Sequence, residues 1–155
     1  MIRSILIGLV AGQRSMTPLA ILAGAARRGE LPPDALGAKL LASPHAAAGA
    51  VAFAAGELAG DKMPDAPDRV ILPGLIARAI TGGFAGAALA SRDRRAAGAL
   101  LGAAAAVASS FLGFHARVAA MRRFGQVSTG FVEDALALGS AVAIVSARRP
   151  LLTAA

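Results

Sequence analysis

The chain of 155 residues contains no cysteine, tryptophan or tyrosine, and its only aromatic residues are six phenylalanines. The absence of cysteine excludes disulfides, thiolate chemistry and cysteine-ligated zinc sites. The absence of tryptophan and tyrosine removes the residues that usually mark the two membrane–water interfaces. It also leaves no stacking platform of the kind that nucleic-acid-binding proteins offer to bases.

Charged residues are scarce as well, at 16% of the chain, whereas soluble domains carry about 25%. Hydrophobic residues make up 56% of the sequence, and the mean hydropathy is +0.64. Glycine, alanine and leucine dominate, and small side chains let helices pack closely in lipid. The length suits one domain. Composition therefore predicts a single integral membrane domain over residues 1–155, with membrane lipid as a partner.

Cations outnumber anions by 16 to 9, which gives a net charge of +7. The arginines stand in pairs beside apolar runs, at positions 27–28, 94–95, 122–123 and 148–149. Arginine pairs at the ends of apolar runs follow the positive-inside rule of membrane proteins. A nucleic-acid partner is not expected, because the arginines do not line one helix face.

Five apolar segments can be read along the chain: 4–26, 40–60, 70–91, 96–116 and 131–147. A spanning helix needs about 20 residues, and the fourth segment has no Asp, Glu, Lys or Arg. We therefore expect an all-α, polytopic transmembrane bundle of about five to six helical segments.

Arg14 and Arg78 interrupt the first and third segments. A central arginine costs roughly 2.5–3.5 kcal/mol on the insertion scale, and eight Leu, Ile, Val or Phe residues at about 0.45 each offset one arginine. Both segments should then depend on neighbouring helices. Four GxxxG pairs fit such packing: Gly8/Gly12, Gly56/Gly60, Gly82/Gly86 and Gly98/Gly102.

The two halves of the sequence, 1–69 and 70–149, look like an internal, inverted repeat. "GLVAGQRSMTPLA" (8–20) aligns with "GLIARAITGGFAGAALA" (74–90), which matches Arg14 with Arg78 and Thr17 with Thr81. Each stretch should then break, at Pro18 in the first and at Gly82–Gly83 in the second. Such paired interruptions are typical of transporter binding sites.

The stretch "RSMTP" predicts a broken first helix, with Thr17 as N-cap and Pro18 as the first helical residue. The second half-helix would present free N–H groups and a positive dipole end at membrane depth, which attracts anions. Arg14 would add a permanent positive charge beside it.

Carboxylates are available to pair with the arginines. Glu57 and Asp61 are four residues apart and share one helix face, while Glu133 and Asp134 stand where a helix is expected to begin. Arg14 and Arg78 should lie near each other, each within reach of a carboxylate. Two alternatives remain open: the arginines only neutralise buried acids, or the acids only cap or end helices.

His115 and Arg117 end the fourth segment. A lone histidine in an apolar run is more often a packing residue, and with His45 far away in sequence no metal site is expected. The chain has no P-loop, GxSxG or HExxH motif. We therefore assign no catalytic residue and no cofactor.

The elements "AGQRSMTPLA", "AAGELAGDKMPDAPDR" and "VEDALALG" resemble the small bacterial membrane proteins catalogued as domain of unknown function 4126, over nearly the whole chain. The resemblance implies a multi-pass protein of the bacterial inner membrane and no assigned activity. It carries over the following motif residues: Arg14, Ser15, Thr17, Pro18, Glu57, Asp61, Lys62, Pro64, Glu133 and Asp134.

The leading hypothesis is a small channel or carrier, expected to be a homodimer, with a charged midplane site for a small anion or an anionic lipid headgroup. Arg14, Thr17, Arg78 and Thr81 would build the site together with carboxylates from the second and fifth segments. One alternative is a membrane scaffold with a structural charge network. Others are a membrane enzyme that uses Glu57 and Asp61 as an acid/base pair, and a soluble alanine-rich bundle.

Charge also predicts the orientation. If every segment crosses once, five cations fall on the side of the N-terminus and eight on the side of residues 27–39. The positive-inside rule then places the C-terminus in the cytoplasm.

Overall fold

The computed structural model describes residues 1–60 and 71–147, and every regular element in these two ranges is helical. The elements are α1 (Ile2–Gln13), α2 (Thr17–Arg27), α3 (Ala38–Leu41), α4 (Pro44–Gly60), α5 (Leu72–Ala88), the 3-10 helix η1 (Arg92–Arg94), α6 (Arg95–Phe124) and α7 (Gln126–Ser146). The expected all-α class is confirmed. In the described ranges, α7 and the continuous helical stretch Arg92–Phe124 are long and apolar enough to cross a membrane.

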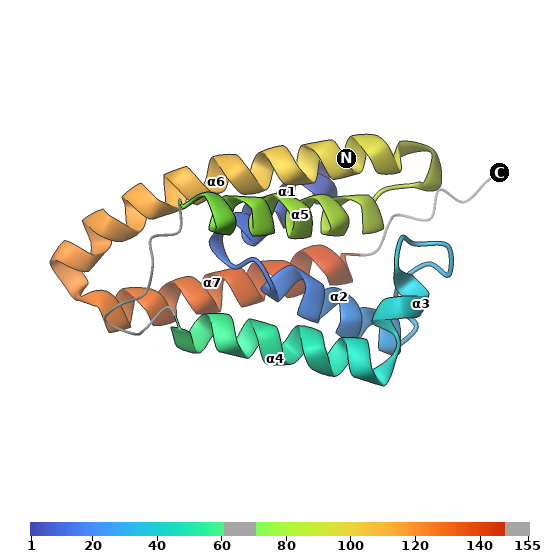
Figure 1. Ribbon diagram of the computed structural model, residues 1–155, viewed down its shortest axis with the longest axis horizontal. Helices are drawn as coiled ribbons and strands as arrows, with labels where there is room; N and C mark the ends of the chain where they lie inside the picture. The colour runs from blue at the N-terminus through green and yellow to red at the C-terminus, as the bar shows by residue number, and fades with distance from the viewer. Residues whose placement is uncertain (61–70, 148–155) are drawn as a thin grey trace.

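The first predicted segment folds as a V of two short helices (Figure 1). The predicted break is present: α1 ends at Gln13, and Arg14 is extended with φ −139° and ψ 103°. A helix of 12 residues is about 18 Å long, roughly half the hydrocarbon thickness. The first segment is therefore not one continuous helix, and α2 returns to the end of the bundle from which α1 starts.

The position of Arg3 shows the same return. Its Nε and Nη2 atoms donate hydrogen bonds to the carbonyl oxygens of Ile144 and Val145, at 3.0 and 2.9 Å. The beginning of α1 therefore lies beside the last turn of α7. The N-terminus and residue 27, predicted at opposite ends, lie at the same end of the bundle (Figure 1).

Helices α1, α5 and α6 form a tightly packed layer. The Ser4 hydroxyl of α1 donates to the carbonyl of Gly86 in α5 at 2.9 Å, and the Ser109 hydroxyl of α6 donates to the carbonyl of Leu9 at 2.9 Å. A Cβ added at Gly82 would lie 2.8 Å from the carbonyl oxygen of Gly102. Because glycine has no side chain, the three backbones can approach one another closely.

Glycine does not break α5, so the predicted break at Gly82–Gly83 is wrong. The helix runs without interruption through Gly82 and Gly83, because glycine keeps its N–H and lowers helix stability only by its flexibility. Its role here is close contact with α6. The pair Gly56/Gly60 differs, since a Cβ at either position would meet no atom of the described residues within 4 Å.

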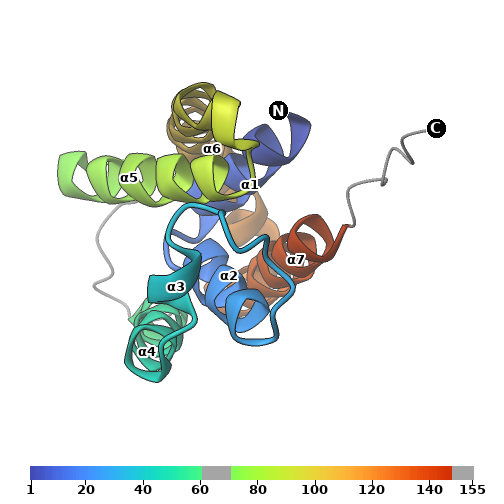
Figure 2. The ribbon, with the colours of Figure 1, turned by 90° about the vertical axis from the view of Figure 1, so that its right-hand side faces the viewer.

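A second layer holds α2 between α4 and α7 (Figure 2). Its core consists of small and branched apolar side chains, among them Leu22, Ala23, Ala47, Ala137 and Ala141. Large apolar side chains of this layer are exposed on its outer surface, with Phe53 of α4 at 69% and Leu136 of α7 at 65%. This layer places α4 and α7 on either side of the break between α1 and α2.

Candidate functional site

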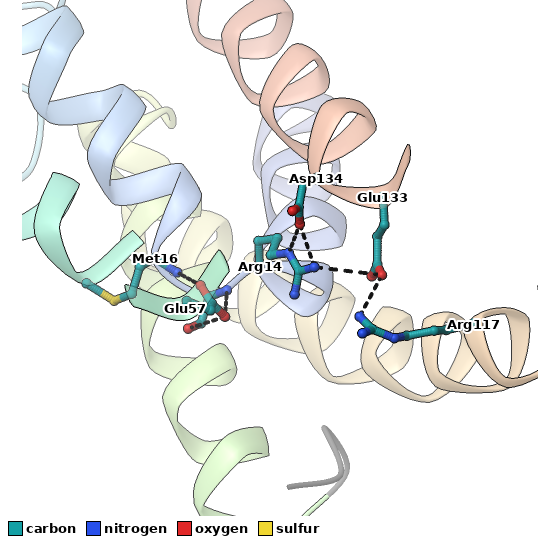
Figure 3. A network of polar contacts seen from close by, with 7 residues as sticks. Arg14, Met16, Glu57, Arg117, Glu133 and Asp134 are labelled. Carbon is teal, nitrogen blue, oxygen red and sulfur yellow. Dashed lines mark hydrogen bonds and ion pairs between the residues drawn. The ribbon is translucent and has the colours of Figure 1, made fainter. Parts of the chain in front are cut away.

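The break between α1 and α2 is closed by a carboxylate from α4. Oε1 of Glu57 accepts hydrogen bonds from the Ser15 backbone N–H at 2.7 Å and from the Ser15 hydroxyl at 3.0 Å. Oε2 accepts from the Met16 N–H at 2.9 Å (Figure 3). Backbone N–H groups at a helix start need an acceptor that lipid cannot supply. Glu57 supplies it, and its negative charge suits the positive end of α2.

This contact corrects the predicted cap. Met16, not Thr17, is the N-cap residue of α2. The Met16 side chain forms no capping hydrogen bond with the helix. Thr17 is the first helical residue and is buried. Pro18, which was predicted to be the first helical residue, is the second. A carboxylate brings two acceptor atoms and a full charge, so it binds the free N–H groups more strongly than a hydroxyl does.

Arg14 lies at the end of α1, with a side chain only 1% exposed. Its Nε donates to Oδ1 of Asp134 at 2.7 Å, and its Nη2 lies 2.5 Å from the same oxygen. The same Nη2 is 3.9 Å from Oε2 of Glu133, which also binds Nη1 of Arg117 at 3.1 Å. Figure 3 shows the resulting alternation of acid and base between α1, α6 and α7.

This charge network, defined as Arg14, Arg117, Glu133 and Asp134, contains two cations and two carboxylates. A buried ion pair repays its desolvation only when its hydrogen bonds are well made, and the 2.7 Å hydrogen bond from Arg14 Nε to Asp134 meets that condition. Glu133 and Asp134 lie about two turns inside α7, which begins at Gln126. They therefore do not cap this helix, and the hypothesis that they only cap it is wrong.

The other predicted site residues fall into three groups. Arg78 and Thr81 are buried in α5, and the Thr81 hydroxyl donates to the Arg78 carbonyl at 3.2 Å; the pairing of Arg78 with a carboxylate stays a prediction. Asp61 and Lys62 lie outside the described residues. His115 is exposed and packs edge-on against Phe114, with ring centroids 5.6 Å apart.

An open groove of about 870 Å³ runs between α1, α6 and α7 beside the charge network. Its walls are mostly apolar, and Arg117 and Glu133 are part of them. The residues that line it are Leu9, Val10, Gln13, Ser109, Leu112, Gly113, Ala116, Arg117, Ala120, Phe124, Ser128, Thr129, Val132, Glu133, Leu136, Ala137 and Ser140.

Sequence reasoning missed this groove and two polar residues in it. Gln13 Nε2 donates to the carbonyl of Ser109 at 2.7 Å, which ties the end of α1 to α6. Both are polar residues within apolar segments, and that signal could have selected them. In residues 1–60 and 71–147, no group of three His, Cys, Asp or Glu side chains could hold a metal ion.

The chain matches no family model, no curated protein and no solved structure. The functional argument therefore depends on the geometry of the charge network and the groove.

Proposed function

We propose that this protein is a small multi-pass carrier of the bacterial inner membrane, similar to the domain of unknown function 4126 family, that binds an anionic amphiphile. An apolar chain of the ligand would occupy the groove, and its headgroup would lie near Arg117. The single observation that carries the proposal is an apolar groove of about 870 Å³ with a charged pair in its wall.

A membrane location accounts for the large apolar side chains that are exposed on the outer surface of the bundle. Phe53 of α4, Ile80 of α5 and Leu136 of α7 are 69%, 65% and 65% exposed. Extensive exposed apolar surface marks interaction sites or a membrane. Helices α4 and α5, with 17 residues each, reach the lower limit of spanning length, so we infer four crossings by α4 to α7.

An amphiphile fits the groove better than a small free anion does. The N–H groups at the start of α2 are already bonded to Glu57, and Arg14 is held by Asp134. The positive features that would attract a small anion are thus matched by carboxylates of the protein itself. The groove instead offers mainly apolar surface, against which an acyl chain can pack through van der Waals contacts.

Arg117 is the group that can exchange partners. It binds Glu133 on the wall of the groove, and Glu133 is also within 3.9 Å of Arg14. A phosphate or carboxylate headgroup can therefore take over Arg117 while Glu133 keeps a cation nearby. Guanidinium groups bind such planar or tetrahedral oxyanions in a two-pronged manner.

Binding of a lysophospholipid to the detergent-purified protein, measured by native mass spectrometry, tests the proposal. Ala116 lines the groove, so Ala116→Trp should fill it and weaken binding of lysophosphatidylglycerol by tenfold or more. Ala104 is exposed on the same helix outside the groove, so Ala104→Trp is the matched control and should bind normally. Equal binding by both variants would overturn the proposal.

Arg117→Gln tests the headgroup contact. This variant should lose the preference for lysophosphatidylglycerol over the zwitterionic lysophosphatidylcholine while still binding the apolar chain. An unchanged preference would contradict the role of Arg117.

Transport is a separate measurement. A fluorescent phosphatidylglycerol in vesicles that contain the protein should change leaflet faster than in empty vesicles, and Ala116→Trp should abolish the difference. Binding without lipid movement would favour the second candidate, a membrane scaffold. The mutual pairing of Arg14 with Asp134 and of Arg117 with Glu133 supports that candidate.

The proposed homodimer can form through α4. Its Gly56 and Gly60 have no atom within 4 Å of an added Cβ, which leaves space for a small-residue contact with a second copy. Chemical crosslinking in native membranes measures this directly.

A further inference from the structure

One end of the molecule gathers basic residues from four separate parts of the chain. It is reached by the start of α1, the end of α2, α3 and η1 (Figure 1). Two bonds connect these parts: Arg3 binds the Ile144 carbonyl at the end of α7, and Arg95 binds the backbone carbonyl of Asp34. The cations of this basic end are Arg3, Arg27, Arg28, Lys39, Arg92, Arg94 and Arg95.

Carboxylates at the basic end are fewer: of the described residues there, they are Glu30, Asp34 and Asp93. Arg28 binds Glu30 through two hydrogen bonds of 2.6 and 2.9 Å, which lower the pKa of the Glu30 carboxyl. With all three of these carboxylates ionised, the seven cations of the basic end still exceed them by four. Arg27, Lys39, Arg92 and Arg94 are exposed.

Apolar side chains accompany these cations. Leu36 and Leu40 flank Lys39 and are 38% and 65% exposed. Cations next to exposed leucines are typical of a surface that lies at the boundary between headgroups and acyl chains. Anionic lipid attracts such cations over about one Debye length, roughly 8–10 Å.

We infer that the basic end binds the anionic headgroups of the cytoplasmic leaflet, and that the α1–α2 hairpin re-enters the membrane from that same side. Both the N-terminus and the end of α7 then face the cytoplasm. The inference does not depend on which ligand the groove takes. It differs from the orientation read from the sequence, which placed Arg3 on the side opposite to Arg27.

The lengths and directions of the helices support the re-entrant path of α1 and α2. The N-terminal half of α1 contacts the C-terminal half of α5 through Ser4 and Gly86. Helix α1 runs in the same direction as α6, since Gly8 lies near Gly102 and Gly12 lies near Ser109. Helix α1 therefore starts at the same membrane face as α6. Because α2 returns to that face, only α4 to α7 cross, and an even number of crossings keeps both termini on one side.

Cysteine labelling tests the path directly, because the chain has no cysteine of its own. We choose three positions at the basic end, Ile2→Cys, Glu30→Cys and Ser91→Cys, and one at the far end, Phe124→Cys. A membrane-impermeant maleimide should label the first three only in inside-out vesicles and Phe124→Cys only in intact spheroplasts. Labelling of Ile2→Cys and Glu30→Cys from opposite sides would overturn the re-entrant hairpin.

An experiment with lipid vesicles tests whether anionic lipid is the partner of the basic end. To exclude binding in the groove, the experiment uses the Ala116→Trp protein, in which the groove is filled. The thermal midpoint of this protein in phosphatidylcholine vesicles should rise when phosphatidylglycerol is added, and salt should reduce the rise. The variant Arg27→Gln/Lys39→Gln/Arg94→Gln should lose most of this rise. The control variant Arg122→Gln/Arg123→Gln alters cations at the end of α6, at the far end, and should lose less.

Either of two outcomes would refute the lipid assignment. One is an equal loss in both variants. The other is a rise that persists in the triple variant, in which case an acidic protein, not lipid, would be the partner to seek for the basic end.

Discussion

Replacing Glu57 with alanine removes the acceptor from two backbone N–H groups at the α1–α2 break. Both groups, on Ser15 and Met16, bind this carboxylate at 2.7 and 2.9 Å. A hydrogen bond to a charged group contributes about 1.5–3 kcal/mol, so two contribute about 3–6 kcal/mol. Glu57 is partly exposed, and water that replaces it would recover part of this. We expect a net loss of about 2–4 kcal/mol.

The assay is thermal unfolding in one detergent, followed by circular dichroism. For a chain of this size, 1 kcal/mol shifts the midpoint by about 2–4 °C, so the midpoint of Glu57→Ala should fall by about 5–15 °C. Glu57→Gln keeps one side-chain oxygen as an acceptor, so the midpoint of this variant should fall about half as far. Glu30→Ala removes a carboxylate bound to the exposed Arg28 and serves as the control, with no change expected. A midpoint for Glu57→Ala equal to that of Glu30→Ala would refute the reasoning.

Three further predictions use the same assay. Thr17→Val should change the free energy of unfolding by less than about 0.5 kcal/mol, since the Thr17 side chain does not cap α2. A loss near 1 kcal/mol would instead support a cap formed by the Thr17 hydroxyl. Gly102→Ala should cost about 1–3 kcal/mol by overpacking, because its Cβ would meet the backbone of α5, whereas Gly139→Ala has free space and should be neutral or stabilising. Arg14→Met should cost about 3 kcal/mol by leaving the partly buried Asp134 without its cation, and adding Asp134→Leu should recover part of this loss; additive losses would show that the pair does not interact.

Much of the fold could be predicted from composition and local signals. Apolar runs between polar connections gave the main helices, because any segment that buries its backbone must form hydrogen bonds within itself. The break at "RSMTP" was also predictable, since Pro18 supplies no N–H and favours a helix start. The residues of the charge network were selected from their type alone, because ionisable groups in apolar segments are costly and seldom without a partner.

The pairing of those residues could not be read from the sequence. Arg14 and Asp134 are 120 positions apart, and several acids were equally suitable partners by chemistry. The cap on α2 came from Glu57 on another helix, whereas local preference favoured Thr17. Long-range contacts of this kind depend on which helices become neighbours, and that follows from how whole surfaces fit together.

The sequence by itself thus determined an all-helical chain of apolar segments with a broken first helix, because these properties depend on hydrophobicity and backbone hydrogen bonding along short stretches. Only the tertiary structure decided that α1 and α2 return to one end, that glycines of α5 serve packing and not a break, and that a groove opens beside Arg117. Each of these depends on the direction in which a helix packs against its neighbours. Close contacts such as that between Gly82 and Gly102 fix this direction, and no local pattern encodes it.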